Sequence, residues 1–305
     1  MTKKQTNTLT LPAGAKGQKR EPSIGFIGAG RVARALGIAL HRAGYAVTAV
    51  ASRTLASAKL LATQIDGCTA RRDSQAVVDA CQLVFITTPD DTIPAAIAHL
   101  KWHPGQTAVH CSGADSVALL RAAACQGITT GVFHPLQAFT GDKTDANAFQ
   151  GITFSIEAEE PLRAKLKDMA CALGGYWIVL SAEDKALYHA SAVIACNYMV
   201  TLAGIAASLW ANFGADTEEA TRALLPIMKH TVANIEHLGL PDCLTGPIAR
   251  GDAGTVRRHL QAIRARAPGL EPTYRELGQL TVSMAHAAGR LDAATVANLT
   301  AALAE

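Results

Sequence analysis

Two patterns of hydrophobic positions alternate along the chain between residues 23 and 181. Short runs rich in β-branched residues predict strands, and the alanine- and leucine-rich stretches between them predict amphipathic helices. The predicted strands are residues 24–27, 46–51, 83–87, 108–111, 129–133, 152–156 and 176–180. The predicted helices are residues 32–42, 55–64, 92–99, 116–124 and 162–172. This alternation is typical of an α/β fold with a doubly wound, mainly parallel sheet.

After residue 181 the strand-like runs stop and only helical patterns follow. They predict helices over residues 183–212, 217–238, 252–266, 271–288 and 292–303. Pro226 lies inside the second of these, where it should kink or break the helix because proline lacks a backbone donor. We therefore expect a disordered tail over residues 1–22, an α/β domain over residues 23–181 and an all-α domain over residues 182–305.

The stretch from Ala186 to Ala211 contains no Asp, Glu, Lys or Arg and exceeds the ~18 apolar residues of a membrane span. Polar side chains are nevertheless spread around it, at His189, Ser191, Asn197, Thr201 and Ser208. Basic residues usually flank a membrane span, but none directly follows this stretch. We therefore expect the central buried helix of a soluble protein and no membrane partner.

Composition narrows the class of protein. At 305 residues and 49 % hydrophobic content the chain can bury a sizeable core. Aromatic residues make up only 5 %, and the basic strip of Arg257, Arg258, Arg264 and Arg266 has no aromatic residues between its members, so we expect no nucleic-acid partner. The seven cysteines are odd in number, widely spaced and lack a CxxC pair, which favours a reducing cytoplasmic setting without disulfides or a bound metal.

The strongest local motif is glycine-rich and joins the first predicted strand to the first helix. Gly28 allows a tight turn, Gly30 leaves room for a pyrophosphate to approach the backbone, and Ala33 lets the helix pack close to the strand. In this strand-turn-helix context the motif predicts dinucleotide binding by a Rossmann domain. The residues expected to contact the cofactor here are Gly28, Ala29, Gly30, Arg31 and Val32.

The end of the second predicted strand points to the kind of dinucleotide. NAD-binding sites usually place an acid there, about 20 residues after the glycines, whereas this chain has Ser52 and Arg53. A hydroxyl and a guanidinium suit a 2′-phosphate, so NADPH/NADP is preferred over NAD(H) and over an F420-type cofactor. The alternative is that Arg53 is a solvated residue at a helix start. Residues Thr87, Thr88 and Pro89 end another strand and should also touch the cofactor.

Hydride transfer to a carbonyl or an imine needs a proton donor near the reacting atom. Lys185 and His189 are four residues apart and share one face of a predicted helix, so either is a candidate. The alternatives are an exposed lysine at the helix start and a satisfied core histidine. Ser112 ends a strand near the expected nicotinamide, and it and Asn197 would orient the substrate.

Two loops offer further substrate contacts. His134 and Gln137 follow a strand and begin a loop that reaches Asn147, although a purely structural turn is about as plausible. Thr245 starts a Thr-Gly-Pro turn with backbone N–H groups for an anion, and Arg250 further along could grip a carboxylate in a bidentate way. A plain turn between two helices is the alternative. Cys111 has no motif that marks it as a nucleophile.

Several segments together resemble one family. They are the Gly28–Ala33 turn, Ser52–Arg53, and residues 110–113, 133–139, 188–198 and 244–252. Over about residues 22–300 the chain resembles the Rossmann-like family with a DUF2520 C-terminal domain, which is similar to ketopantoate reductases, pyrroline-5-carboxylate reductases and β-hydroxyacid dehydrogenases.

The resemblance implies an NADPH-dependent reductase for a small 2-oxo acid such as ketopantoate or for a cyclic imine, and a homodimer formed through the helical domain. In ketopantoate reductase and β-hydroxyacid dehydrogenase relatives, a lysine followed one turn later by asparagine acts as acid and substrate anchor. Lys185 matches that lysine, but His189 stands where asparagine is expected, so the acid is either residue. A non-catalytic, NADPH-sensing regulatory protein is the alternative to a reductase.

Overall fold

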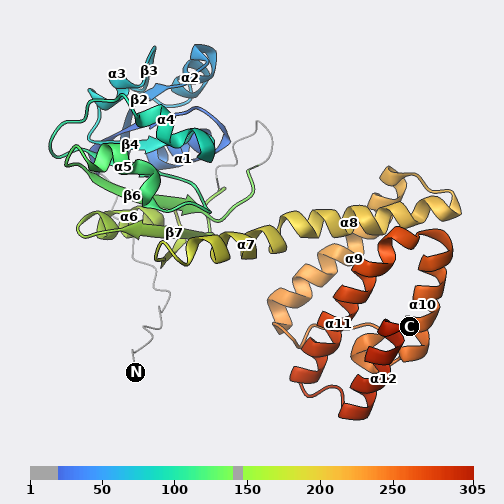
Figure 1. Cartoon of the computed structure of the whole chain (residues 1–305). Helices are drawn as coiled ribbons and strands as arrows, with labels where there is room; N and C mark the ends of the chain where they lie inside the picture. Colours follow the sequence, from blue (N-terminus) through green and yellow to red (C-terminus); the bar gives the residue numbers. More distant parts are fainter. Residues whose placement is uncertain (1–19, 140–146) are drawn as a thin grey trace, which may run out of the picture. The chain divides into compact units, whose positions relative to one another are not determined.

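The computed structural model describes residues 20–139 and 147–305 (Figure 1). The chain divides into two compact units, with the division between Cys196 and Asn197. Strand β1 already begins at Arg20, and residues 1–19 of the expected tail lie outside the described residues. The first helix of the C-terminal half, α7 (Lys185–Ala195), belongs to the same unit as the sheet.

The first unit is built on an eight-stranded sheet with the order β3-β2-β1-β4-β5-β6-β7-β8. The strands are β1 (Arg20–Ile27), β2 (Tyr45–Ala51), β3 (Thr69–Arg71), β4 (Leu83–Ile86), β5 (Thr107–His110), β6 (Thr129–Pro135), β7 (Thr153–Ala158) and β8 (Tyr176–Val179). Neighbouring strands pair in parallel, except that β6 and β7 are antiparallel. The predicted doubly wound, mainly parallel sheet is confirmed.

Side chains that alternate along the strands build a separate core on each face of the sheet. Phe85 of β4 lies in the core that also contains Phe26 and Phe133, and its neighbours Val84 and Ile86 lie in the other. The helices of the first core are α1 (Arg31–Arg42), α2 (Leu55–Ala62) and α6 (Leu162–Ala172). Those of the second are α3 (Gln75–Val78), α4 (Ile93–Ile97) and α5 (Arg121–Ala124). Helices on both faces leave the carboxyl ends of the strands free for a ligand.

The two elements absent from our predictions are β3 and α3. β3 has three residues with exposed to half-buried side chains, and α3 has four residues. Segments this short show no full hydrophobic period, so the sequence pattern does not reveal them.

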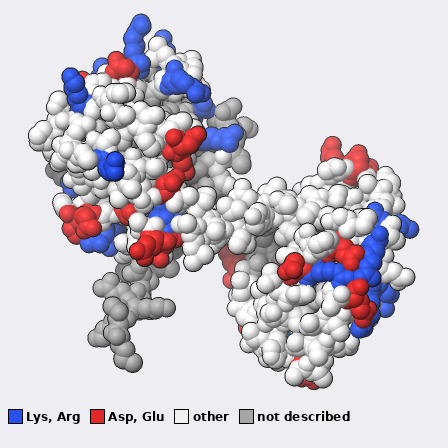
Figure 2. All heavy atoms as spheres, viewed as in Figure 1, with Lys and Arg blue, Asp and Glu red and all other residues white. Residues whose placement is uncertain are grey.

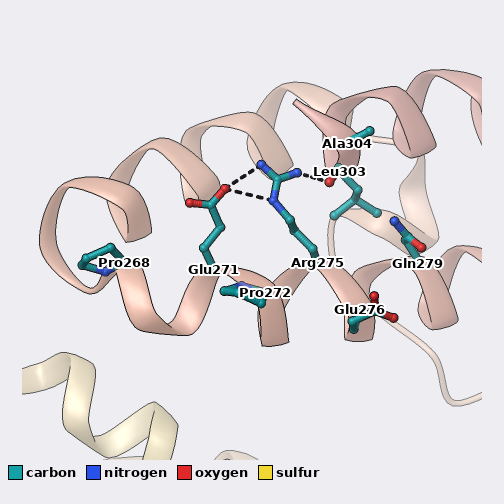
Figure 3. Close-up of a pocket in the computed structure, with 8 residues that line it drawn as sticks. All are labelled: Pro268, Glu271, Pro272, Arg275, Glu276, Gln279, Leu303 and Ala304. Carbon is teal, nitrogen blue, oxygen red and sulfur yellow. Dashed lines mark hydrogen bonds and ion pairs between the residues drawn. The ribbon is translucent and has the colours of Figure 1, made fainter.

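The second unit contains helices only, as predicted. They are α8 (Asn197–Leu209), α9 (Thr217–Leu238), α10 (Ala253–Arg266), α11 (Glu271–Ala287) and α12 (Ala293–Ala304), with the short turns η3 (Trp210–Phe213), η4 (Ile248–Arg250) and η5 (Pro268–Leu270). Val256, Leu260 and Leu299 are among the residues of its core. Beside a shallow pocket of about 430 Å³, Arg275 bonds to Glu271 and to the Leu303 carbonyl, which ties α12 to α11 (Figure 3).

Two details of the predicted helices differ in the structure. Of the kink or break expected at Pro226, the break is absent: α9 runs on through this residue, because the loss of one backbone donor leaves the other turns bonded and a capping box at Asp216 and Glu219 secures the start. The predicted helix over residues 183–212 is instead divided at Cys196, between α7 and α8. No proline or glycine marks that division, so the sequence does not signal it.

The burial expected for the apolar segment is also wrong. Among the described residues, Lys185–Phe213 is the one helical stretch long and apolar enough to cross a membrane by length and composition. Only Lys185 and Ala207 are buried in α7 and α8, whereas Leu187 is 78 % exposed and Val200 68 % exposed. Beyond the start of α7 this surface carries no charged side chains on the face drawn in Figure 2. An apolar sequence indicates that a helix is buried against something, but it does not distinguish burial within the chain from burial against another molecule.

Candidate active site

The turn after β1 brings two backbone segments into close contact. Gly28 has a φ of +111°, and a Cβ there would lie 2.7 Å from the carbonyl carbon of Thr87, so a larger side chain does not fit. Gly28 N donates to Ala51 O at 2.8 Å. Gly30 is the N-cap of α1, and a Cβ on it would meet nothing within 4 Å. The first N–H groups of α1 therefore face open space, where they suit an anion.

A cavity of about 690 Å³ opens at this turn. It is lined by Ile27, Gly28, Ala29, Gly30, Arg34, Ser52, Arg53, Thr54, Ser57, Ser74, Thr87, Thr88, Pro89, Thr92, Ala95 and Ala96. Strand order reverses here, with β2 on one side of β1 and β4 on the other, and open α/β sheets bind ligands at such a reversal. Arg31 and Val32 are the predicted cofactor residues that do not line the cavity.

The end of the cavity beyond β2 carries positive charge and hydroxyl groups. Arg53 and Arg34 line it together with Ser52, Thr54 and Ser57, and its described lining contains no Asp or Glu. Arg34, Thr54 and Ser57 were not predicted from the sequence. Two signals point to them in retrospect: Arg34 lies one helical turn after Gly30, and Thr54 caps the helix that follows Arg53. Guanidinium and hydroxyl groups without a carboxylate are suited to a phosphate.

Ser112, just beyond β5, is buried and lies at the centre of a polar cluster. Its hydroxyl donates to Asp90 Oδ2 at 2.7 Å, lies 3.0 Å from Asp115 Oδ2 and accepts a bond from Asp115 N at 3.1 Å. Asp90 directly follows Pro89 of the cavity lining, so the cluster adjoins the cavity. The hydroxyl that we expected to orient a substrate is thus occupied by two carboxylates. The expected role of Ser112 in orienting a substrate stays a prediction.

His110, the last residue of β5, holds the backbone of this cluster in place. Its side chain is fully buried; Nδ1 accepts from Ser112 N at 3.1 Å and Nε2 donates to Ser116 O at 2.9 Å. Burial lowers the pKa of His110 to about 4, so the ring is neutral at physiological pH. Burial also raises the pKa of the neighbouring Cys111 thiol to about 12, which keeps that thiol protonated.

Lys185 reaches the same cluster from the start of α7. Its side chain is 1 % exposed and Nζ donates to Ser112 O at 3.1 Å, so the alternative of an exposed lysine at a helix start is wrong. Burial lowers the pKa of Lys185, and the carboxylates of Glu157, Asp115 and Asp90 oppose that change. One ammonium group thus sits among several acids.

Two histidines converge on Gly113. A Cβ on Gly113 would lie 2.7 Å from Nδ1 of His189 and 2.8 Å from Nε2 of His134, so only glycine leaves room for both rings. His189 Nδ1 is buried and has no hydrogen-bond partner among the described residues. His134 Nδ1 lies 3.1 Å from the Tyr188 hydroxyl. Burial lowers the pKa of His134 to about 3, so this ring is neutral as well.

The structure therefore brings Ser112, His134, Lys185 and His189 together within the first unit. Four further members were not predicted as site residues: Asp90, Asp115, Glu157 and Tyr188. Asp90 and Tyr188 each directly adjoin a predicted residue, which is a signal that the sequence offered. Glu157 carries no such signal, because its place beside residue 117 depends on the antiparallel pairing of β7 with β6.

Four other residues were predicted to contact the substrate: Gln137, Asn197, Thr245 and Arg250. Gln137 is exposed and its side chain bonds within its own loop, to Ala148 O at 3.4 Å. Asn197, Thr245 and Arg250 belong to the second unit and are exposed. Asn197 begins α8, and Arg250 ends η4.

Family models match both parts of the chain. Residues 7–135 match the model of a Rossmann-like domain, and residues 152–281 match the domain of unknown function DUF2520. No curated protein matches the sequence significantly.

Solved structures are similar over most of the chain. A Bacteroides fragilis protein named as an NADP oxidoreductase has 25 % sequence identity and a TM-score of 0.67, covering 86 % of this chain and 98 % of its own. A Thermotoga maritima protein has 26 % identity and a TM-score of 0.69, covering 87 % and 98 %. A 1-pyrroline-5-carboxylate reductase from Streptococcus pyogenes, with 18 % identity, a TM-score of 0.60 and coverage of 86 % and 97 %, shares the fold.

Proposed function

Because the chain belongs to the family that joins a Rossmann-like domain to a DUF2520 domain, we propose that it is an NADPH-dependent oxidoreductase. Its substrate is a small molecule, either a 2-oxo acid of the ketopantoate type or a cyclic imine. One observation carries the proposal: a cavity of about 690 Å³ at the reversal point of the sheet adjoins a cluster of titratable side chains in which Lys185 is buried. We assign the dinucleotide to the cavity and the reacting carbonyl or imine to the cluster.

The residues around the cavity fit NADP(H). Gly30 leaves open space in front of the α1 N-terminus, where a Cβ would otherwise stand, so a diphosphate can approach the backbone. Arg53, Ser52 and Ser57 surround the end at which a 2′-phosphate would lie. The Bacteroides fragilis relative, named as an NADP oxidoreductase, supports the same cofactor.

When bound, the nicotinamide supplies a hydride to the carbon of the substrate's double bond. The chain must then provide a proton for the oxygen or nitrogen of that bond. Lys185 is enclosed and donates to Ser112 O. These contacts suit a cation that stabilises the carboxylates of the cluster and sets the electrostatic potential around them. His189 is the less enclosed of the two, so we propose it as the proton donor. Arg250 remains the proposed ligand for a substrate carboxylate.

An NADPH-consumption assay tests the function. Purified protein is mixed with NADPH and, in turn, ketopantoate, other 2-oxo acids and pyrroline carboxylates, and the fall in NADPH absorbance is followed. We expect turnover with at least one substrate and much slower turnover with NADH. His189→Ala and Lys185→Ala should each abolish most of the turnover. His99→Ala, which changes an exposed histidine just beyond α4, should not.

Two outcomes would contradict a reductase. If calorimetry detects binding of neither NADPH nor NADP, the proposal fails. If NADPH binds tightly and no substrate is turned over, the chain is a sensor of NADPH and not an enzyme.

We further propose that a second copy of the chain covers the apolar surface of α7 and α8, giving a cytoplasmic homodimer. The surface carries exposed Leu187, Ile194, Val200 and Leu202 without an acidic or basic neighbour between residues 186 and 211. An apolar patch of this kind marks a binding surface. Polar residues spread around the helix favour a protein partner over lipid.

Light scattering after size exclusion tests the dimer. Val200→Asp places a charge on this surface and should convert dimer to monomer. Leu60→Asp is the matched control, because Leu60 is also an exposed apolar residue, 47 % accessible, but lies on α2. A monomeric wild-type protein would contradict the proposal.

A further inference from the structure

His134, on β6, is held on one side of its ring and unpaired on the other. Nδ1 lies 3.1 Å from the Tyr188 hydroxyl, and the two rings meet edge to face with centroids 5.7 Å apart. No hydrogen-bond partner of Nε2 is found among the described residues. Nε2 lies beside Gly113, at the point where the cluster converges.

The surroundings of the ring determine its protonation. Burial is the main cause that lowers the pKa of His134, and the nearby charge of Lys185 lowers it further. The ring therefore carries a single N–H at physiological pH. Burial raises the pKa of Tyr188, which keeps its phenol protonated.

One of the two possible hydrogen-bond directions is stronger. A phenol O–H is a better donor than a neutral imidazole N–H, and an imidazole nitrogen is a better acceptor than a phenol oxygen. This difference in strength favours the arrangement in which the Tyr188 O–H donates to Nδ1 of His134 and the ring proton resides on Nε2. In this tautomer the N–H of His134 points away from Tyr188, toward the side at which Gly113 leaves room.

We propose that Tyr188 is a positioning residue that fixes His134 as its Nε2–H tautomer, so that His134 donates a hydrogen bond to the acceptor atom of the substrate's reducible bond. The inference rests on the proposed reductase function. As hydride adds to carbon, negative charge grows on the attached oxygen or nitrogen, and a preorganised neutral donor stabilises it. His134 keeps its own proton throughout, and the proton that completes the product comes from a separate donor.

The arrangement also selects among substrates. A carbonyl oxygen or a neutral imine nitrogen presents a lone pair to Nε2–H, whereas a protonated imine presents a second N–H. Two donors that face each other leave one buried group unpaired, and sites built on a hydrogen bond reject such analogues strongly. His134 therefore favours ketones and neutral imines over iminium ions.

Nitrogen NMR of the histidine rings tests the tautomer directly. The full-length protein is labelled with ¹⁵N-histidine, and the His134 signals are identified by their loss in His134→Gln. We expect the wild-type pattern of an Nε2–H ring, and in Tyr188→Phe a mixture of both tautomers. Tyr176→Phe, on β8, is the matched control and should leave the pattern unchanged. An Nδ1–H ring in the wild type, or an unchanged ring in Tyr188→Phe, would overturn the proposal.

Kinetics distinguish a positioning role from a structural one. Tyr188→Phe should lower kcat at least tenfold for a 2-oxo acid, in keeping with the roughly 10²–10³-fold cost of losing an oxyanion donor, and leave the dissociation constant of NADPH unchanged. Equal losses for ketone and iminium substrates would overturn the selectivity. Failure of the wild type to bind NADPH would overturn the reductase function and the substrate role together, while the ring measurement would still decide the tautomer.

Discussion

Acid should destabilise the first unit through His110, because the fold buries this ring in its neutral form. Both ring nitrogens are occupied: Nδ1 accepts from Ser112 N and Nε2 donates to Ser116 O. A second ring proton would abolish the acceptor at Nδ1 and place a charge inside the core. Burial is accordingly the main cause of the fall in the His110 pKa from 6.5 to about 4.

The sign and size of the effect follow from these values. Between about pH 6.5 and pH 4 the unfolded chain binds a proton at residue 110 that the folded chain does not. The contribution of His110 to the free energy of unfolding is therefore fully present above pH 6.5 and is lost as the pH decreases. At about 1.36 kcal/mol for each pKa unit, the whole shift corresponds to about 3 kcal/mol, and the part lost between about pH 7 and pH 4.5 is roughly 2.5 kcal/mol.

Urea unfolding at several pH values measures this loss. Trp210→Phe removes the tryptophan of the second unit, so that fluorescence from Trp102 and Trp177 reports the first. In this background, His110→Asn keeps an acceptor for Ser112 N–H and cannot titrate. We expect the His110 protein to lose about 2.5 kcal/mol more than the Asn variant on acidification. Equal losses in the two proteins, or a His110 ring that titrates near pH 6.5 by NMR, would refute the reasoning.

Three further substitutions have expected outcomes. Gly28→Ala forces a Cβ against the Thr87 backbone at 2.7 Å and a φ of +111°, so it should lower the unfolding free energy by about 1–3 kcal/mol and weaken NADPH binding in calorimetry. Arg53→Ala should weaken NADPH by about tenfold to a hundredfold and leave NADH unchanged, while the exposed Arg42→Ala alters neither. Gly113→Ala should abolish turnover while NADPH still binds, since its Cβ meets two imidazoles; retained turnover would contradict that crowding.

The cofactor half of the site could be predicted because its information is local. A strand, a Gly28-to-Gly30 turn and a helix are consecutive in the chain, and Ser52–Arg53 follows the next strand directly. Arg31 was predicted as a cofactor residue, but Arg34 lines the cavity instead. The packing of α1 decides which of its residues faces the cavity, and the sequence pattern does not show this. The substrate half combines residues that are far apart in the chain. Ser112, His134, Lys185 and His189 were each identified from the sequence, but the contacts with their partners were not.

The order of elements, the parallel sheet, the helical second half and the glycine turn follow from the sequence by itself, because hydrophobic period and glycine conformation act within a few residues. Tertiary structure decided the burial of Lys185, the occupation of Ser112 by two acids, the neutrality of His110 and the exposure of α7 and α8. Each of these depends on desolvation or on a contact between residues far apart in the chain, and neither is encoded in a local pattern.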